Sequence, residues 1–157
     1  MLCRREFPLD QFPSLPELCF SAIKRFSFNC LRSAGRGLSA AAEIRPVEAQ
    51  YQDELYRACY ITLGHNVHLT SEWTGSLTSG RVDFQIKSVK WAIECVREAD
   101  RLEQHIARFL LGGKYHRWIS SGEIREYILL DFRTSKPVKI RGTFILILYL
   151  FILNANS

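Results

Sequence analysis

Residues 81–96 carry two consecutive strand patterns, which constrain the fold more than any other part of the sequence. In residues 81–87, the apolar side chains Val82, Phe84 and Ile86 alternate with polar ones. This period of two is typical of a strand with one buried face. Residues 90–96 follow after a short turn and are more apolar, as expected at the centre of a sheet. The two strands therefore favour a hairpin inside a larger sheet.

Helical and strand patterns surround this hairpin. Glu48–Leu63 has apolar residues near one helical face and ends at Gly64, a residue suited to a helix C-terminus. Residues 98–111 return to the helical period, and residues 66–73 and 126–132 are strand-like. The predicted order is helix, three strands, helix, strand. We therefore expect an α/β fold with a mixed central sheet flanked by helices.

An N-terminal arm precedes this domain. Ser14 and Glu17 form a capping box, and apolar residues recur at helical spacing through residues 15–32. This predicts an amphipathic helix, which a linker of small residues follows. We therefore divide the chain into an arm at residues 1–44 and an α/β domain at residues 45–157.

The C-terminal segment is unusual because residues 144–153 are ten unbroken apolar residues. A membrane-spanning helix needs about 20 such residues, so this run is too short. It is either a buried strand or an aberrant, aggregation-prone terminus. On the second alternative, we expect the chain to lack part of a longer parent domain.

The composition limits the cellular compartments and the kinds of partner to be expected for this protein. The 157 residues carry a net charge of +5, which permits a nucleic-acid partner without requiring one. The five cysteines are odd in number and lack CxxC spacing, which suits reduced thiols inside the cell, the nucleus included. Residues 1–10 do not resemble a secretory signal. Residues 19–42 have no acid and resemble a transit peptide in composition, although a surface helix packed on the domain is the alternative that we prefer. The sequence contains no G-x-S-x-G motif, so it does not support a serine hydrolase.

Asp83 and Glu94 are the most informative polar residues, because each interrupts an otherwise apolar strand. A buried carboxylate needs a salt bridge, backbone donors or a metal ion. In a hairpin, both side chains would reach one edge of the sheet. Two carboxylates there predict a Mg²⁺ site, since Mg²⁺ prefers oxygen ligands. Ion pairs with lysine or arginine are the alternative.

The same order of elements, with an Asp on the second strand and a Glu on the third, resembles the PD-(D/E)XK restriction-endonuclease-like superfamily. The run GRVDFQIKSVKWAIECVREADRLEQHIARFLLGGKY, followed by EYILLDFRTSKP, is similar to nuclease-like domains of Crinkler-type effector and related proteins. The resemblance covers residues 48–137. It implies Mg²⁺-dependent hydrolysis of nucleic-acid phosphodiester bonds, with DNA the expected substrate.

The resemblance also implies roles for individual residues. Asp83 and Glu94 would bind the metal, and Glu54 on the preceding helix would be the accessory acid. The superfamily places a lysine two residues after the Glu, where this chain has Val96. Arg97 and Lys87 are the candidates for that missing positive charge.

The helix predicted at residues 98–111 has a basic face. Residues three and four apart are neighbours on a helix surface. Much of this face is therefore formed by Arg101, Gln104, His105 and Arg108. We predict that this face binds the nucleic-acid backbone, since arginine suits phosphate geometry. A solvated helix face with no ligand is the alternative.

A rival function belongs to a different class. The same fold could serve as a catalytically inactive module that binds nucleic acid or protein, as in an effector. Val96 in the lysine position favours this rival, whereas the presence of both Asp83 and Glu94 favours the enzyme.

Overall fold

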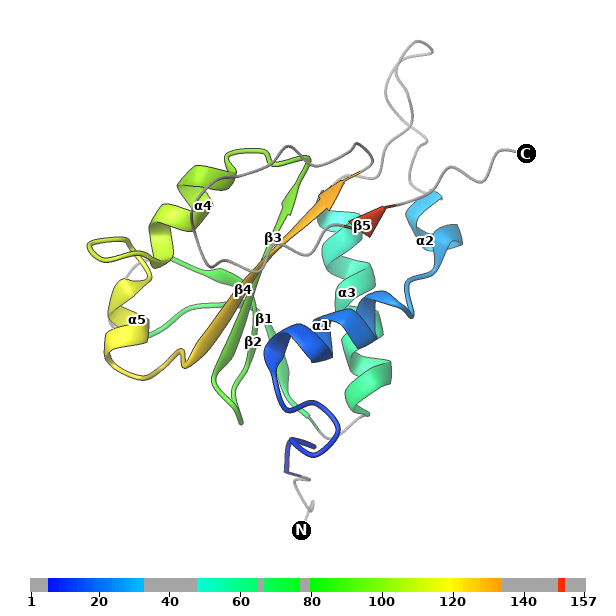
Figure 1. The fold of residues 1–157 in the computed structure, drawn as a ribbon, viewed down its shortest axis with the longest axis horizontal. Helices are drawn as coiled ribbons and strands as arrows, with labels where there is room; N and C mark the ends of the chain where they lie inside the picture. Colours follow the sequence, from blue (N-terminus) through cyan, green and yellow to red (C-terminus); the bar gives the residue numbers. More distant parts are fainter. Residues whose placement is uncertain (1–5, 33–47, 65–66, 77–79, 134–149, 152–157) are drawn as a thin grey trace.

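The computed structural model describes residues 6–32, 48–64, 67–76, 80–133 and 150–151, and it has a mixed α/β architecture (Figure 1). The helices are α1 (Leu15–Ile23), α2 (Phe28–Arg32), α3 (Glu48–Leu63), α4 (Leu102–Phe109) and α5 (His116–Ser120). The strands are β1 (Leu69–Trp73), β2 (Val82–Ile86), β3 (Trp91–Arg97), β4 (Glu126–Arg133) and β5 (Leu150–Phe151).

The strands form one mixed sheet in the order β1-β2-β3-β4-β5. β1, β2 and β3 are antiparallel neighbours, as a meander of short connections requires. β4 returns parallel to β3 after α4 and α5, and β5 is parallel to β4. β3 is therefore the strand at which antiparallel pairing changes to parallel pairing. It is buried along nearly its whole length, which explains its apolar sequence.

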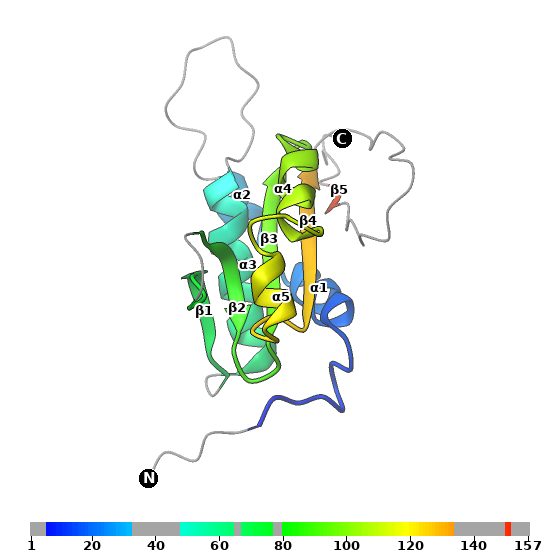
Figure 2. The same cartoon turned by 90° about the vertical axis from the view of Figure 1, so that its left-hand side faces the viewer.

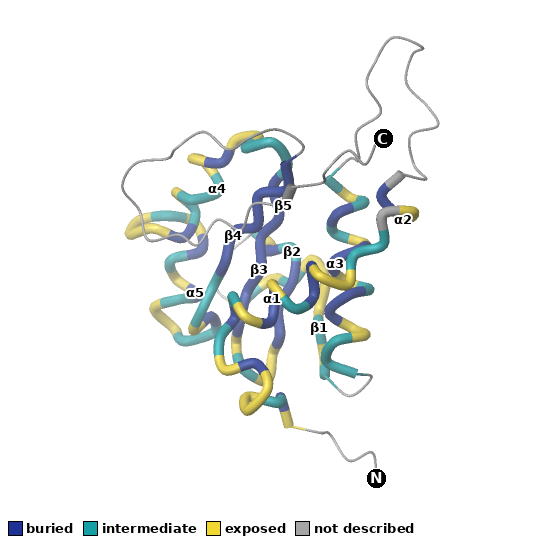
Figure 3. Tube along the Cα trace, turned by 45° about the vertical axis from the view of Figure 1, so that its right-hand side comes forward, coloured by how far each residue is buried: buried dark blue, intermediate teal, exposed yellow. Residues whose placement is uncertain are grey.

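Helices cover both faces of the sheet (Figures 1 and 2). α1 and α3 pack on one face, where they meet alternate residues of β3 and β4 such as Ile93 and Leu130. α4 and α5 pack on the other face over Ala92, Val96 and Leu129. The burial colouring places the darkest part of the chain along the central strands between these two helical layers (Figure 3).

The N-terminal helix α1 belongs to the same apolar cluster as α3 and the sheet. Leu15, Leu18, Cys19 and Ala22 have no exposed surface. α1 contacts both α3 and β4. Its spacing of apolar residues is thus the sequence signature of a core helix.

The predicted order of elements is confirmed, with differences at their ends. The helix expected over residues 15–32 is wrong as a single element, because it is broken between α1 and α2, where the Ser27 N–H donates to a side chain of α3, Glu54. The helix expected from residue 98 begins at Leu102 instead. Glu98, Ala99 and Arg101 have positive φ angles, which an α-helix does not accept. α5 was not predicted.

Some predictions concern residues outside the described ranges. The linker, the domain boundary at residues 44–46 and most of the apolar run at residues 144–153 lie there. Within that run, the two residues of β5 pair with the end of β4. Among the helices that the structure describes, none is long and apolar enough to cross a membrane.

Candidate functional site

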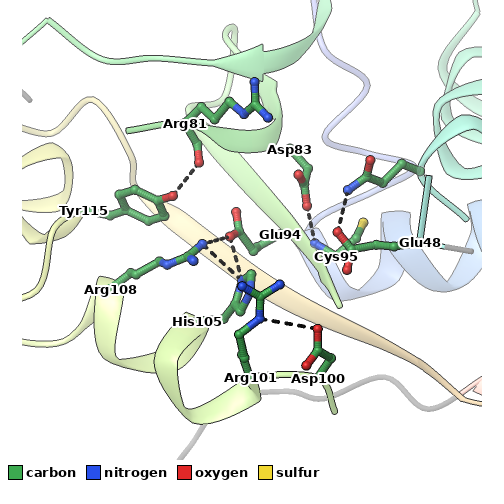
Figure 4. A network of polar contacts seen from close by, with 11 residues as sticks. Glu48, Arg81, Asp83, Glu94, Cys95, Asp100, Arg101, His105, Arg108 and Tyr115 are labelled. Carbon is green, nitrogen blue, oxygen red and sulfur yellow. Dashed lines mark hydrogen bonds and ion pairs between the residues drawn. The ribbon is translucent and has the colours of Figure 1, made fainter. Parts of the chain in front are cut away.

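The candidate site lies where β2 and β3 separate. The pairing of these strands begins at Ile86↔Trp91, and the last pair is Phe84↔Ile93. Beyond this pair, the Cys95 N–H donates to Asp83 Oδ2 at 2.6 Å, so a side chain of β2 replaces the backbone partner. Asp83 and Glu94 face each other across this opening (Figure 4). The structure thus places the two acids near each other, on neighbouring strands of the predicted hairpin.

Glu94 lies on the sheet face that α4 covers, and its side chain is 3% exposed. Its Oε1 atom accepts hydrogen bonds on the α4 side, 2.9 Å from His105 Nδ1 and 2.8 Å from Arg108 Nη1. Its Oε2 atom is buried without a hydrogen-bond partner among the described residues. A buried carboxylate oxygen without a partner is costly, so a ligand that reached this atom would relieve that cost.

Asp83 is held in a state that favours its protonated form. Burial, followed by the negative charge of Glu94, raises the pKa of Asp83 from 3.8 to about 7. The hydrogen bond from Cys95 opposes this shift, and the charge of Glu48 adds to it. Two carboxylates that repel each other in a buried opening would be stabilised by a shared cation.

Glu48, which the sequence prediction did not select, is an acid of α3 that lies near this pair (Figure 4). Burial raises the pKa of Glu48, an effect that the nearby His105 opposes and the negative charge of Glu94 reinforces. Glu48 begins α3 and accepts a hydrogen bond from Gln52 at 3.3 Å. Glu48 is therefore an α3 acid near enough to Asp83 and Glu94 to affect their charges.

Glu54 points elsewhere, because six residues of helix rotate its side chain by about 120° from Glu48. It is 3% exposed and accepts hydrogen bonds from Arg57, with Nε at 2.9 Å from Oε2. Burial raises the pKa of Glu54, but the hydrogen bonds from Arg57 and the Ser27 N–H outweigh it and hold the pKa below its ordinary value. Glu54 thus forms a structural ion pair with Arg57, and its hydrogen bond with Ser27 joins α3 to the segment before α2.

Neither cation predicted for the missing lysine is placed at the acids. Lys87 is exposed and follows Ile86, at the far end of the β2–β3 pairing. It lies four residues from Asp83, or about 13 Å along a strand. Arg97 lies on the face of α3, where its charge lowers the pKa of Tyr51 against the larger effect of burial. Val96 is fully buried under α4 and α5, so its side chain completes the core.

The side chains that pair with Glu94 come from α4. His105 and Arg108 both contact Glu94, and Arg108 Nη1 lies 3.3 Å from His105 Nδ1. Arg108 is also placed over the ring of Tyr115, 5.9 Å from its centroid. The predicted basic face therefore divides into two parts. Its inner part holds Glu94, and its outer part consists of Arg101 and Gln104.

The outer part of this face is open to solvent. Arg101 is 65% exposed and pairs with Asp100 at 3.4 Å, and Gln104 is exposed. Both line a cavity of about 520 Å³ at the start of α4. A further arginine, Arg81, is 64% exposed beside the opening and was not predicted (Figure 4). Its position two residues before Asp83 on the chain was the available sequence signal.

The donors at the opening suit a hard divalent cation only in part. Asp83 and Glu94 supply carboxylate oxygens, and Glu48 lies close enough to influence both. Within the described ranges, no three acid, histidine or cysteine side chains converge closely enough to hold a metal ion by themselves. Water would have to complete the coordination, as is usual for Mg²⁺.

Comparison with known proteins adds no relative. The chain matches no protein family, no curated protein and no solved structure.

Proposed function

We propose that this protein is a Mg²⁺-dependent nuclease that hydrolyses phosphodiester bonds of nucleic acid, with DNA the first substrate to test. The observation that carries the proposal is the pair of facing carboxylates in the β2–β3 opening, one with a raised pKa and the other with an unpartnered oxygen. The order of elements and the resemblance of residues 48–137 to PD-(D/E)XK nucleases agree with it.

The residues of the opening would supply part of the coordination shell of the metal that this proposal requires, and water would complete it. Glu94 Oε2 and Asp83 would hold the ion, and Glu48 would hold one of its waters. When bound, Mg²⁺ would polarise a phosphate oxygen and lower the pKa of a water. The positive charge of the ion would also attract both Asp83 and Glu94 and so offset the repulsion between them.

The other residues of the site would act on the substrate. Arg81 and Arg101 are exposed on either side of the opening and would attract the phosphate backbone. Such contacts position a nucleic acid without reading its sequence. His105 would keep Glu94 in its orientation through Nδ1.

A non-catalytic module that binds nucleic acid or protein is the second candidate. It is favoured by one observation, because Arg108 already forms an ion pair with Glu94 and His105 lies within hydrogen-bond distance of it. An acid with two such partners is stable without a metal ion. The basic residues around the opening would then bind an anionic partner without cleaving it.

The two functions are separated by a cleavage assay on plasmid DNA in Mg²⁺, with Asp83→Ala and Glu94→Ala in parallel. The nuclease predicts cleavage by the parent that is lost in both variants and in chelator. Circular dichroism of each variant controls for folding. DNA binding without cleavage by the folded parent would refute the nuclease and support the binding module.

A further inference from the structure

Hydrolysis of a phosphodiester builds negative charge on the phosphate, and a cation fixed near the metal stabilises that charge. The described residues offer few groups for this task at the β2–β3 opening. Lys87 and Arg97 lie away from it, and Val96 is apolar and buried. Arg108 is the arginine whose guanidinium contacts a carboxylate of the opening.

Arg108 differs from its neighbour His105 in how firmly it is held. The side chain of His105 is 12% exposed, whereas that of Arg108 is 33% exposed. Arg108 also has a second attraction that does not involve Glu94, the ring of Tyr115. The Tyr115 hydroxyl donates to the Arg81 carbonyl oxygen at 2.5 Å, which fixes this ring beside the start of β2. The ring of Tyr115 therefore gives the guanidinium a contact at the opening that does not depend on Glu94.

We infer that Arg108 is an exchangeable counter-ion, which pairs with Glu94 in the metal-free protein and moves to the substrate phosphate when a divalent cation binds. The inference rests on the proposed nuclease function. A Mg²⁺ ion bound to Glu94 would repel a guanidinium on the same carboxylate, because both positive charges would lie within ion-pair distance of that carboxylate. A phosphate bound at the metal attracts that guanidinium through charge-assisted hydrogen bonds. His105 stays on Oε1 and keeps Oε2 directed at the metal.

Because the two partners of Glu94 on α4 have different roles, their substitutions should have opposite effects on metal binding. Without Arg108, the metal loses a competitor and the substrate loses a contact. Without His105, the ligand carboxylate loses its orientation, which typically costs metal affinity 10–100-fold. An arginine that only stabilised the fold would instead weaken metal and substrate binding together.

The test measures Mg²⁺ binding to the full chain by isothermal titration calorimetry and binding of a short fluorescein-labelled DNA duplex in Ca²⁺ by anisotropy. For Arg108→Gln, we expect unchanged or tighter Mg²⁺ binding and about tenfold weaker duplex binding. For His105→Ala, we expect Mg²⁺ affinity to fall by about tenfold or more. Arg117→Gln, an exposed arginine of α5, is the matched control and should change neither.

Two results for Arg108→Gln would overturn the inference: Mg²⁺ affinity that falls together with duplex affinity, and duplex affinity equal to that of the parent. If this variant does not fold, Arg108→Lys is judged by the same criteria, with severalfold weaker duplex binding expected because lysine lacks the guanidinium fork. A parent that binds Mg²⁺ and cleaves DNA, combined with either overturning result, refutes the exchange and leaves the nuclease. A parent that binds no Mg²⁺ refutes both.

Discussion

Replacing Asp83 by Asn should make the metal-free protein more stable at neutral pH. The Asp83 carboxyl group is buried beside Glu94, and its pKa is raised from 3.8 to about 7. Above that pH, the folded protein must hold two facing negative charges. Asparagine has nearly the same shape, carries no charge, and its Oδ1 atom can still accept the hydrogen bond from the Cys95 N–H. The substitution removes the repulsion and keeps the contact.

The magnitude follows from the difference between the folded and unfolded pKa values. A shift from 3.8 to about 7 corresponds to at most about 4 kcal/mol, at roughly 1.4 kcal/mol per unit. Because Asp83 is partly exposed, water screens its charge, and we expect about 1–3 kcal/mol. For a chain of this size, that raises the melting temperature by roughly 2–12 °C.

The pH dependence of unfolding predicts the sign of this stability change independently. Between pH 3.8 and about 7, the folded state keeps a proton on Asp83 that the unfolded chain releases. Stability of the parent therefore falls as the pH rises through this window and levels off above it. Asp83→Asn lacks this decline, so the two proteins should be equally stable near the acid end and should diverge toward neutrality.

The assay is thermal and urea unfolding in chelator across this pH range, repeated in Mg²⁺. Added Mg²⁺ should stabilise the parent, since the ion binds the folded state, and should leave Asp83→Asn unchanged. The reasoning is refuted if Asp83→Asn is less stable than the parent at pH 8 in chelator, or if the two pH profiles run parallel.

Three further predictions concern residues outside the acid pair. Glu54→Gln should cost about 2 kcal/mol at neutral pH, because it removes a charged hydrogen-bond acceptor of Arg57. Since the folded pKa of Glu54 is lowered, this loss should shrink as the pH falls below 4.5, which urea unfolding can follow. Lys87→Ala should leave plasmid cleavage within about twofold of the parent, because surface substitutions have small effects; a loss comparable to that of Asp83→Ala would contradict the placement of Lys87. Trp118→Ala should destabilise the fold by about 3–5 kcal/mol in urea titrations, since the indole is fully buried against Trp73 and Tyr115; a cost below about 1 kcal/mol would show that this core relaxes freely.

The local periods of the sequence were sufficient to predict most elements and the acid pair. The alternation of Val82, Phe84 and Ile86 predicted β2, and the compact turn after it predicted the hairpin. The pairing of Phe84 with Ile93 then places Asp83 opposite Glu94. These features depend on neighbours in the chain, so they can be found without the tertiary structure. The distance of Lys87 from Asp83 was also available from the rise of a strand.

Features that depend on tertiary contacts could not be predicted in this way. Glu48 and Glu54 are both acids of α3, and only the packing of α3 on the sheet decides which one faces the opening. The break before α2 depends on the contact between Ser27 and Glu54, 27 residues apart. The positive φ angles of Glu98 and Ala99 occur at residues that usually favour helix, so local preference predicted the wrong start for α4.

The packing of α1 against β4 has a consequence for the order in which the chain can fold. α1 is synthesised before β4, the strand that it contacts, which is completed only at Arg133. A nascent chain must therefore keep the part of the apolar face of α1 that packs on β4 uncovered after α3 has been made, until β4 has left the ribosome. Contacts between such distant segments form slowly, and transiently exposed apolar surface promotes aggregation. The interval before β4 emerges is thus the stage of biosynthesis at which a chaperone would have the most surface to bind.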